Sequence, residues 1–219
     1  MSSSKPVLYS YWRSSCSWRV RIALNLKKID YEYKAVNLLT TDYLDDPDFR
    51  AVNPSRKLPA LVIDGVNLTE SLAIMEYLDE KYPDRFPLLP KDPVMRAHAR
   101  AIALQVASNI QPLQNNAVVK FLNAEKPGYG QKWAVHWITR GLGDLEEMVS
   151  RTTGGKYAVG DQISIADICI PSILYNAKRF GIDVSAYSKL CMIDAETAKV
   201  PEFQAAHPDR QPDANPEAK

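Results

Sequence analysis

The sequence predicts two domains of different fold class, an α/β domain followed by an all-helical domain. The first 80 or so residues alternate between short apolar runs and segments with helical spacing, in the order β-α-β-α-β-β-α. Residues 83–93 then contain four prolines, so no helix continues through them, and we interpret them as the linker. The segments that follow have helical spacing. A chain of 219 residues is long enough for two such domains.

The α/β half begins with a strand, a helix and a second strand, an arrangement that favours parallel strands joined by a right-handed crossover. Later, Asp64-Gly65 separates two apolar runs, which is the strongest short hairpin signal in the chain. The predicted elements are strand Pro6–Tyr11, helix Cys16–Lys28, strand Tyr31–Val36, a loop with one short helix over Thr40–Asn53, hairpin strands Lys57–Ile63 and Val66–Leu68, and helix Ser71–Tyr82.

The second half is predicted to consist of helices whose breaks are set by proline and glycine. Val94–Phe121 is predicted as one long helix, bent or broken near Pro112, because proline removes a backbone hydrogen bond. The tail His207–Lys219 contains three prolines and many polar residues, so we expect it to lack regular structure. The other predicted helices are Gln131–Arg151, Ser164–Arg179, Ser185–Ala195 and Val200–His207.

Composition and charge exclude several classes of function. A net charge of +1 gives no reason to expect nucleic acid or a membrane surface as partner. No stretch approaches the roughly 18 unbroken apolar residues of a membrane span, and the N-terminus has no apolar signal core. Cys16, Cys169 and Cys191 are not closely paired, which indicates a reducing compartment. We therefore expect a cytoplasmic protein whose partner is neither nucleic acid nor a membrane.

The histidines and cysteines do not have the spacing of metal ligands. His98, His136 and His207 are scattered through the second half, and no C-x-x-C or H-x-x-x-H is present. The sequence also lacks a glycine-rich loop of the kind that cradles phosphate. We predict no metal site.

One stretch concentrates nucleophilic and hydroxyl side chains at a predicted helix start. Ser14, Ser15, Cys16 and Ser17 lie where a helix presents unpaired N–H groups and the positive end of its dipole. Such a place suits an anion, including a thiolate. The same pattern is also an ordinary serine N-cap, and this stretch by itself favours the cap.

Two further dipeptides have both a structural and a binding interpretation. Leu58-Pro59 precedes a strand, and a cis bond there would expose the Leu58 backbone to an extended peptide ligand. A plain proline before a strand is the simpler interpretation of that dipeptide. Glu70-Ser71 begins a helix, so Ser71 is a natural N-cap, yet the pair also suits the zwitterionic end of an amino-acid-like ligand.

Signals around Ser164–Arg179 are interpreted as structural. Ser164 and Asp167 have the spacing of a capping box, with Asp in place of Glu, and Cys169 is expected in the core. Arg179, at the end of this helix, is suited to complement the helix dipole.

Taken together, these segments resemble the zeta class of glutathione transferases, the maleylacetoacetate isomerases. The stretch Ser14–Leu24 resembles the signature of that class, and collinear blocks span nearly the whole chain. The blocks are Pro6–Tyr11, Asn53-Pro54, Ser71–Ile74, Ile110–Asn115, Asn176–Phe180 and His207–Asp213. The resemblance implies a thioredoxin-like glutathione-binding domain over residues 1–86 and an all-helical glutathione-transferase domain over residues 92–219 that lines the second-substrate site.

The resemblance also implies roles for individual residues, with glutathione as the cofactor. Ser14 would stabilise the glutathione thiolate, with Ser15 and Cys16 beside it in the catalytic group. Leu58, before a cis Pro59, would pair with the cysteinyl backbone of glutathione, and Glu70 and Ser71 would bind its γ-glutamyl end. Gln111 and Asn115 would line the site. Arg179 would contact the substrate carboxylate.

The implied activity is the cis–trans isomerisation of maleylacetoacetate to fumarylacetoacetate, a step of tyrosine and phenylalanine catabolism. Transferase activity on α-haloacids or other small electrophiles is implied beside it, and so is a homodimer. The alternative is mainly a detoxifying transferase with little isomerase activity, which the Thr40–Asp46 loop and Asn116-Ala117 keep open because they depart from the family pattern. A non-catalytic binding module is disfavoured because Ser14, Glu70 and Ser71 are all present.

Overall fold

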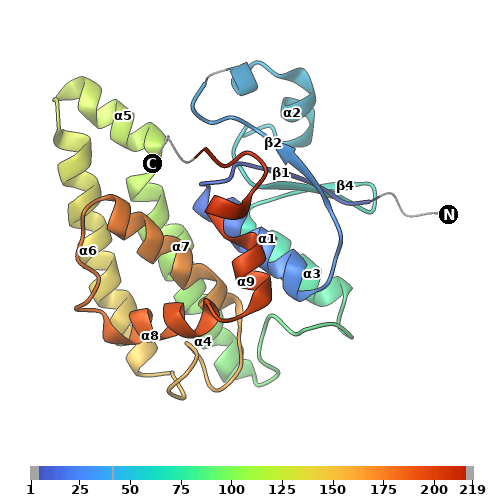
Figure 1. The fold of residues 1–219 in the computed structure, drawn as a ribbon, viewed down its shortest axis with the longest axis vertical. Coiled ribbons are helices and arrows are strands. Elements are labelled where there is room, and N and C mark those ends of the chain that lie inside the picture. Colours follow the sequence, from blue (N-terminus) through green and yellow to red (C-terminus); the bar gives the residue numbers. More distant parts are fainter. Residues whose placement is uncertain (1–4, 41, 216–219) are drawn as a thin grey trace. The chain divides into compact units, whose positions relative to one another are not determined.

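The computed structural model describes residues 5–40 and 42–215 and divides into two compact units. One unit comprises the chain up to Leu88 together with the segment from Val200 onward, and the other is Leu89–Lys199 (Figure 1). This division differs from the expectation that residues 92–219 form one domain. The C-terminal segment groups with the first unit because α9 (Pro201–Ala206) packs on α1 (Ser15–Leu26).

A four-stranded mixed sheet in the order β2-β1-β3-β4 forms the centre of the first unit. β1 and β2 are parallel, as the strand-helix-strand order predicts, whereas β3 is antiparallel to both β1 and β4. Asp64 and Gly65, between β3 and β4, have φ of 52° and 78°, the left-handed pair of a tight hairpin turn. The hairpin prediction is confirmed. The strands are β1 Val7–Ser10, β2 Glu32–Ala35, β3 Ala60–Ile63 and β4 Val66–Thr69.

Helices of the first unit cover both faces of this sheet (Figure 1). α1 packs on α3 (Ser71–Lys81), and their apolar side chains Ile22, Leu24, Ile74 and Leu78 are completely buried. On the other face Phe49, from α2 (Pro47–Val52), stacks on Tyr9 with ring centroids 5.4 Å apart. The predicted short helix is therefore present, preceded by the 3-10 turn η1 (Asp42–Leu44); Thr41 lies outside the described residues.

The second unit is helical, as predicted, but the expected long helix is divided well before its proline. α4 (Pro93–Leu104) passes into the π-helical turn η2 (Gln105–Ile110) and then the 3-10 turn η3 (Gln111–Gln114). Pro112 has no N–H to donate to the preceding turn, and the change of hydrogen-bond spacing accommodates this loss. The remaining helices are α5 Asn116–Glu125, α6 Tyr129–Ser150, α7 Ile165–Arg179 and α8 Ser188–Thr197. Among the described residues no helix has the length and apolar character needed to cross a membrane.

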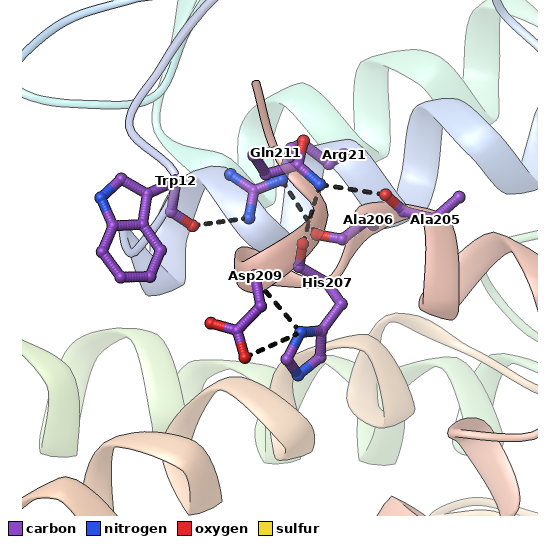
Figure 2. Close-up of polar contacts among 7 residues, drawn as sticks. All are labelled: Trp12, Arg21, Ala205, Ala206, His207, Asp209 and Gln211. Atoms are coloured by element: carbon purple, nitrogen blue, oxygen red, sulfur yellow. Dashed lines mark hydrogen bonds and ion pairs between the residues drawn. The ribbon is translucent and has the colours of Figure 1, made fainter. Parts of the chain in front are cut away.

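The prediction that the tail lacks regular structure is wrong for its first part. Residues Pro208–Arg210 form the 3-10 turn η4, and Gln211 is buried. The Gln211 amide donates to the carbonyls of Ala205 and His207, at 3.0 and 2.8 Å, and so folds the tail back on α9 (Figure 2). Composition does not reveal such a specific contact. Residues 216–219 lie outside the described part of the chain.

The predicted capping box at the start of α7 is confirmed. The fully buried Asp167 carboxyl accepts hydrogen bonds from the N–H groups of Ala158 and Ser164 and from the Ser164 hydroxyl, at 2.7, 2.8 and 3.0 Å. Burial outweighs these three bonds and raises the pKa of Asp167 to about 6. This carboxyl is therefore a structural group that titrates within the range of ordinary buffers.

The titration of Asp167 gives stability a pH dependence of defined sign. Because its folded pKa lies above the ordinary value, its contribution is complete below about pH 4 and declines as the pH rises through about 6. We expect the unfolding free energy of the wild type, minus that of Asp167→Asn, to fall by about 3 kcal/mol between about pH 4 and 7. Urea unfolding of both proteins at a series of pH values measures this difference. A difference that rises with pH would contradict the assignment.

Candidate active site

Strand pairing brings three segments of the first unit to one end of the sheet. Tyr9 near the end of β1 is paired with Ala60 at the start of β3, and Ala60 is paired with Thr69 at the end of β4. The chain therefore leaves β1 and β4, and enters β3, at the same end. The three segments that meet there are Tyr11–Ser14, Leu58-Pro59 and Glu70-Ser71.

Ser14 is the N-cap of α1, as the cap interpretation predicts. Its Oγ accepts the N–H of Ser17 at 3.2 Å, and its carbonyl accepts the N–H of Trp18 at 2.9 Å. The Ser14 N–H donates to the carbonyl of Tyr11 at 3.0 Å, which makes the preceding loop a tight turn. A hydroxyl that accepts one hydrogen bond still has its own proton to donate. Capping and stabilisation of an anion are therefore compatible at Ser14.

A buried arginine connects the starts of α1 and α3. Arg19, which is 1% exposed, directs Nη1 toward the Cys16 Sγ at 4.0 Å and donates from the same nitrogen to the Ser71 Oγ at 3.3 Å. Arg19 thereby links the half-buried Cys16 to Ser71, and Ser14 and Ser15, directly before Cys16, are half-buried as well. We did not single out Arg19 from the sequence. The available signal was its helical spacing from Cys16, three residues earlier.

The predicted N-cap at Ser71 is wrong by one residue. Glu70 is the cap residue and Ser71 is the first residue of α3, because the Ser71 hydroxyl accepts from Arg19. Glu70 has φ 67° and ψ 118°, a left-handed conformation that costs a non-glycine residue on the order of 1 kcal/mol or more. Its side chain makes no capping hydrogen bond to the first N–H groups of α3.

The Leu58-Pro59 bond is cis, as the family resemblance implies. Leu58 is half-buried and Pro59 is buried directly before β3. The approach to this dipeptide is organised by Asn53, whose Nδ2 donates to the Lys57 carbonyl at 2.7 Å. The Asn53 Oδ1 also accepts the N–H and the hydroxyl of Ser55, at 3.0 and 2.8 Å. Asn53 occurs in one of the blocks that resemble the family, but local sequence does not reveal its structural role.

The predicted residues of the second unit lie on η3, α5 and α7. Gln111 begins η3 and is half-buried, and the Asn115 side chain caps α5 by accepting the N–H of Ala117 at 3.0 Å. Arg179 is the exposed last residue of α7. Its Nη1 donates to the Asn176 Oδ1 at 3.1 Å, and Asn176 donates to the buried Gln114 Oε1 at 2.7 Å. Arg179 is thus coupled to η3 through two amides that the sequence did not identify individually.

In residues 5–40 and 42–215 no group of three His, Cys, Asp or Glu side chains is placed to hold a metal ion. The reactive groups that the first unit places near its sheet end are the Ser14 hydroxyl, the Cys16 thiol, the Arg19 guanidinium and the N-termini of α1 and α3.

Comparison with known proteins identifies the family. A family model for the N-terminal domain of glutathione S-transferases matches residues 13–81. The chain is 54% identical over 213 residues to a probable maleylacetoacetate isomerase of Caenorhabditis elegans, covering 97% of this chain and 98% of that protein. The chain belongs to the maleylacetoacetate isomerases, the zeta class of glutathione transferases.

Solved structures of zeta-class relatives have the same fold. A crystal structure of maleylacetoacetate isomerase from Anaeromyxobacter dehalogenans 2CP-1 matches with a TM-score of 0.87 at 42% identity, covering 100% of this chain and 97% of that one. Another structure of that protein, with a TM-score of 0.86 at 43% identity, covering 96% of this chain and 98% of that one, has glutathione bound in its active site. The predicted fold class, a thioredoxin-like domain followed by glutathione-transferase helices, is confirmed for this member of the zeta class.

Proposed function

We propose that this enzyme catalyses the glutathione-dependent cis–trans isomerisation of maleylacetoacetate to fumarylacetoacetate. The observation that carries the proposal is the meeting of the α1 and α3 N-termini, with the Ser14 hydroxyl, at one end of the sheet. Support comes from the relative of 54% identity, which is named a probable maleylacetoacetate isomerase, and from the glutathione-bound relative.

The residues at this sheet end fit the chemistry of glutathione. Its γ-glutamyl end carries an ammonium and a carboxylate, and the exposed Glu70 carboxylate lies directly before the first N–H groups of α3, which the Glu70 side chain does not cap. The Leu58 backbone, before the cis Pro59, would pair with the cysteinyl backbone as an added strand. Ser71 would complete the γ-glutamyl site. Both the γ-glutamyl end and the cysteinyl backbone of the proposed cofactor would therefore find groups of matching charge or hydrogen-bonding character.

Ser14, with Ser15 and Cys16 beside it, would form the catalytic group. When bound, glutathione would supply the thiolate for reversible addition to the cis double bond: the addition would turn that double bond into a single bond that can rotate, and expulsion of the thiolate would re-form the double bond in the trans geometry and return glutathione. The Ser14 hydroxyl would donate to that thiolate, and the positive end of α1 favours the anion. Helix N-termini lower the pKa of a thiol from about 8.5 to roughly 3.5–7.5. The buried guanidinium of Arg19 adds positive charge beside Cys16.

The second unit would bind the substrate. We assign Arg179 to the substrate carboxylate, because a guanidinium matches a carboxylate in charge and in its pair of parallel donors. Gln111 and Asn115 would line the same site. The bond from Arg179 to Asn176 restricts the guanidinium and so reduces the entropy that binding must remove.

The alternative is a detoxifying transferase with little isomerase activity. In that reaction the thiolate would form a bond to the α-carbon of the haloacid and displace the halide as a free anion, so glutathione would be consumed in the conjugate. The Ser14 site would serve both reactions, whereas the name of the relative at 54% identity favours the isomerase. The two activities differ in whether glutathione is returned, which a thiol balance measures.

A homodimer in the cytosol completes the proposal. The spacing of Cys16, Cys169 and Cys191 in the sequence supports a reducing compartment. Sedimentation equilibrium should give twice the chain mass of 24.6 kDa, and cell fractionation should recover the enzyme with the cytosol. A mass equal to one chain would contradict the homodimer, and recovery in another compartment would contradict the cytosolic location.

Substitutions of Ser14 separate its capping role from its catalytic role. Ser14→Ala removes both, so we expect a loss of about 1 kcal/mol in stability and a loss of about 100-fold or more in kcat. Ser14→Asp retains a capping acceptor but places a negative charge beside the thiolate, so stability should stay near that of the wild type while kcat falls at least as far. Isomerisation of maleylacetone with glutathione, together with urea unfolding, measures both quantities.

Asp92→Ala is the matched control, because Asp92 caps α4 by accepting the N–H groups of Val94 and Met95. It should lose a similar stability and keep full turnover. Wild-type turnover in Ser14→Ala would remove Ser14 from the mechanism.

Arg179 is tested by its effect on substrate affinity. Arg179→Ala should raise the KM for maleylacetone about tenfold or more with a smaller change in kcat, because a charge-assisted hydrogen bond contributes about 1.5–3 kcal/mol. Lys178→Ala is the control, since it removes the neighbouring exposed cation, which pairs with Asp194 at 3.5 Å. Equal KM changes in the two variants would contradict a specific role for Arg179.

A further inference from the structure

Both backbone polar groups of Trp12, two residues before Ser14, form hydrogen bonds with charged side chains. Its N–H donates to the Asp213 Oδ2 at 3.0 Å, and its carbonyl accepts from the Arg21 Nη2 at 3.0 Å. Trp12 is 1% exposed, so water does not readily replace either partner. Asp213 is 201 residues further along the chain than Trp12. The C-terminal segment is therefore part of the structure that shapes the loop carrying Ser14.

Arg21 connects the same loop to the end of α9 (Figure 2). It is fully buried on α1, and its Nη1 donates to the Ser10 Oγ at 3.1 Å and the Tyr11 carbonyl at 3.3 Å. Its Nε donates to the Ala206 carbonyl at 3.1 Å. Burial lowers the pKa of Arg21 to about 10, so the guanidinium remains charged at neutral pH. One cation thus joins the last residue of β1, the loop and the C-terminal segment.

The second oxygen of Asp213 is bound to the sheet. The Tyr33 hydroxyl donates to the Asp213 Oδ1 at 2.6 Å, and Tyr33 lies on β2 opposite Leu8 of β1. Burial and this hydrogen bond raise the pKa of Tyr33, which keeps its hydroxyl protonated as the donor. The half-buried Asp213 carboxylate therefore bridges β2 and the Trp12 N–H.

We propose that Asp213 is a positioning residue for the Ser14 site. By accepting from Trp12 and Tyr33 together, it holds the loop Tyr11–Ser14 in the turn from which the Ser14 hydroxyl and the start of α1 face the bound thiol. Loss of the carboxylate leaves a buried N–H without an acceptor, and the loop must shift to recover one. The inference rests on the proposed function for its catalytic consequence, but the restraint of the loop is a property of the ligand-free chain.

Three variants of the full-length chain separate geometry from general stability. Asp213→Ala removes both hydrogen bonds. Asp213→Asn retains an acceptor for Trp12 and offers its N–H to the Tyr33 oxygen, so it keeps the geometry without the charge. Glu202→Gln is the matched control, because the Glu202 ion pair with Lys28 also ties the C-terminal segment to the first unit, at the turn that follows α1, away from the loop Tyr11–Ser14.

Amide hydrogen exchange of the ligand-free proteins measures how firmly the loop Tyr11–Ser14 is held, independently of any activity assay. We expect the amides of residues 12–14 to exchange at least about tenfold faster in Asp213→Ala, and within about threefold of the wild type in Asp213→Asn and Glu202→Gln. Amides of α3 and β3 should not change. Unchanged exchange at residues 12–14, or an equal loss of protection throughout the first unit, would overturn the inference. Where Asp213→Ala does not fold, Tyr33→Phe removes one of the two bonds and should show the same local pattern with a smaller amplitude.

Turnover of maleylacetone with glutathione measures how the loss of this restraint affects catalysis. Asp213→Ala should lower kcat about tenfold, while the KM for maleylacetone, which we assign to Arg179, should change by less than about threefold. Asp213→Asn should recover most of kcat. A wild-type kcat in Asp213→Ala would overturn the inference. A wild-type protein that does not isomerise maleylacetone would instead contradict the proposed function, and the exchange data would still decide the role of Asp213.

Discussion

Two helices begin at the same end of the four-stranded sheet, and the proposed chemistry depends on that arrangement. It follows from strand direction: β1 and β4 both run antiparallel to β3, so the chain leaves them where it enters β3. This arrangement gathers two positive helix ends, the cis Leu58-Pro59 bond and an exposed carboxylate at Glu70. An anionic peptide thiol is the kind of ligand that such a set of groups stabilises.

Ser14 shows how one residue has a structural and a chemical role at this end. Its oxygen completes α1 by accepting from Ser17, and the hydroxyl proton is left to donate to an anion. The loop before Ser14 is restrained by Arg21 of α1 and by Asp213 of the C-terminal segment, which is itself bound by Tyr33 of β2. Such restraint suits a donor that has to be in place before the thiolate forms. Preorganisation of this kind lowers the cost of rearrangement during turnover.

Features determined by neighbouring residues could be predicted from the sequence. The parallel strands, the Asp64-Gly65 hairpin and the Ser164–Asp167 capping box depend on local periodicity or turn chemistry, and all are confirmed. The cap of α3 was misplaced because the Ser71 hydroxyl bonds to Arg19, 52 residues away. The tail was misjudged because composition reveals neither the bonds of the Gln211 amide to Ala205 and His207 nor the bonds that Trp12 and Tyr33 donate to Asp213. The site roles came from the family resemblance and remain proposals, because a residue's contact with a ligand is not encoded in its spacing.

The return of glutathione distinguishes the proposed isomerase from a conjugating transferase most directly. The purified enzyme is incubated with limiting glutathione and excess maleylacetone, and the trans product and the total free thiol are measured together; 2-chloropropionate, an α-haloacid, is assayed in parallel for chloride release. The proposal predicts many molecules of trans product per glutathione, with the free thiol unchanged. Loss of one thiol per molecule of maleylacetone converted, or chloride release without isomerisation, would contradict it.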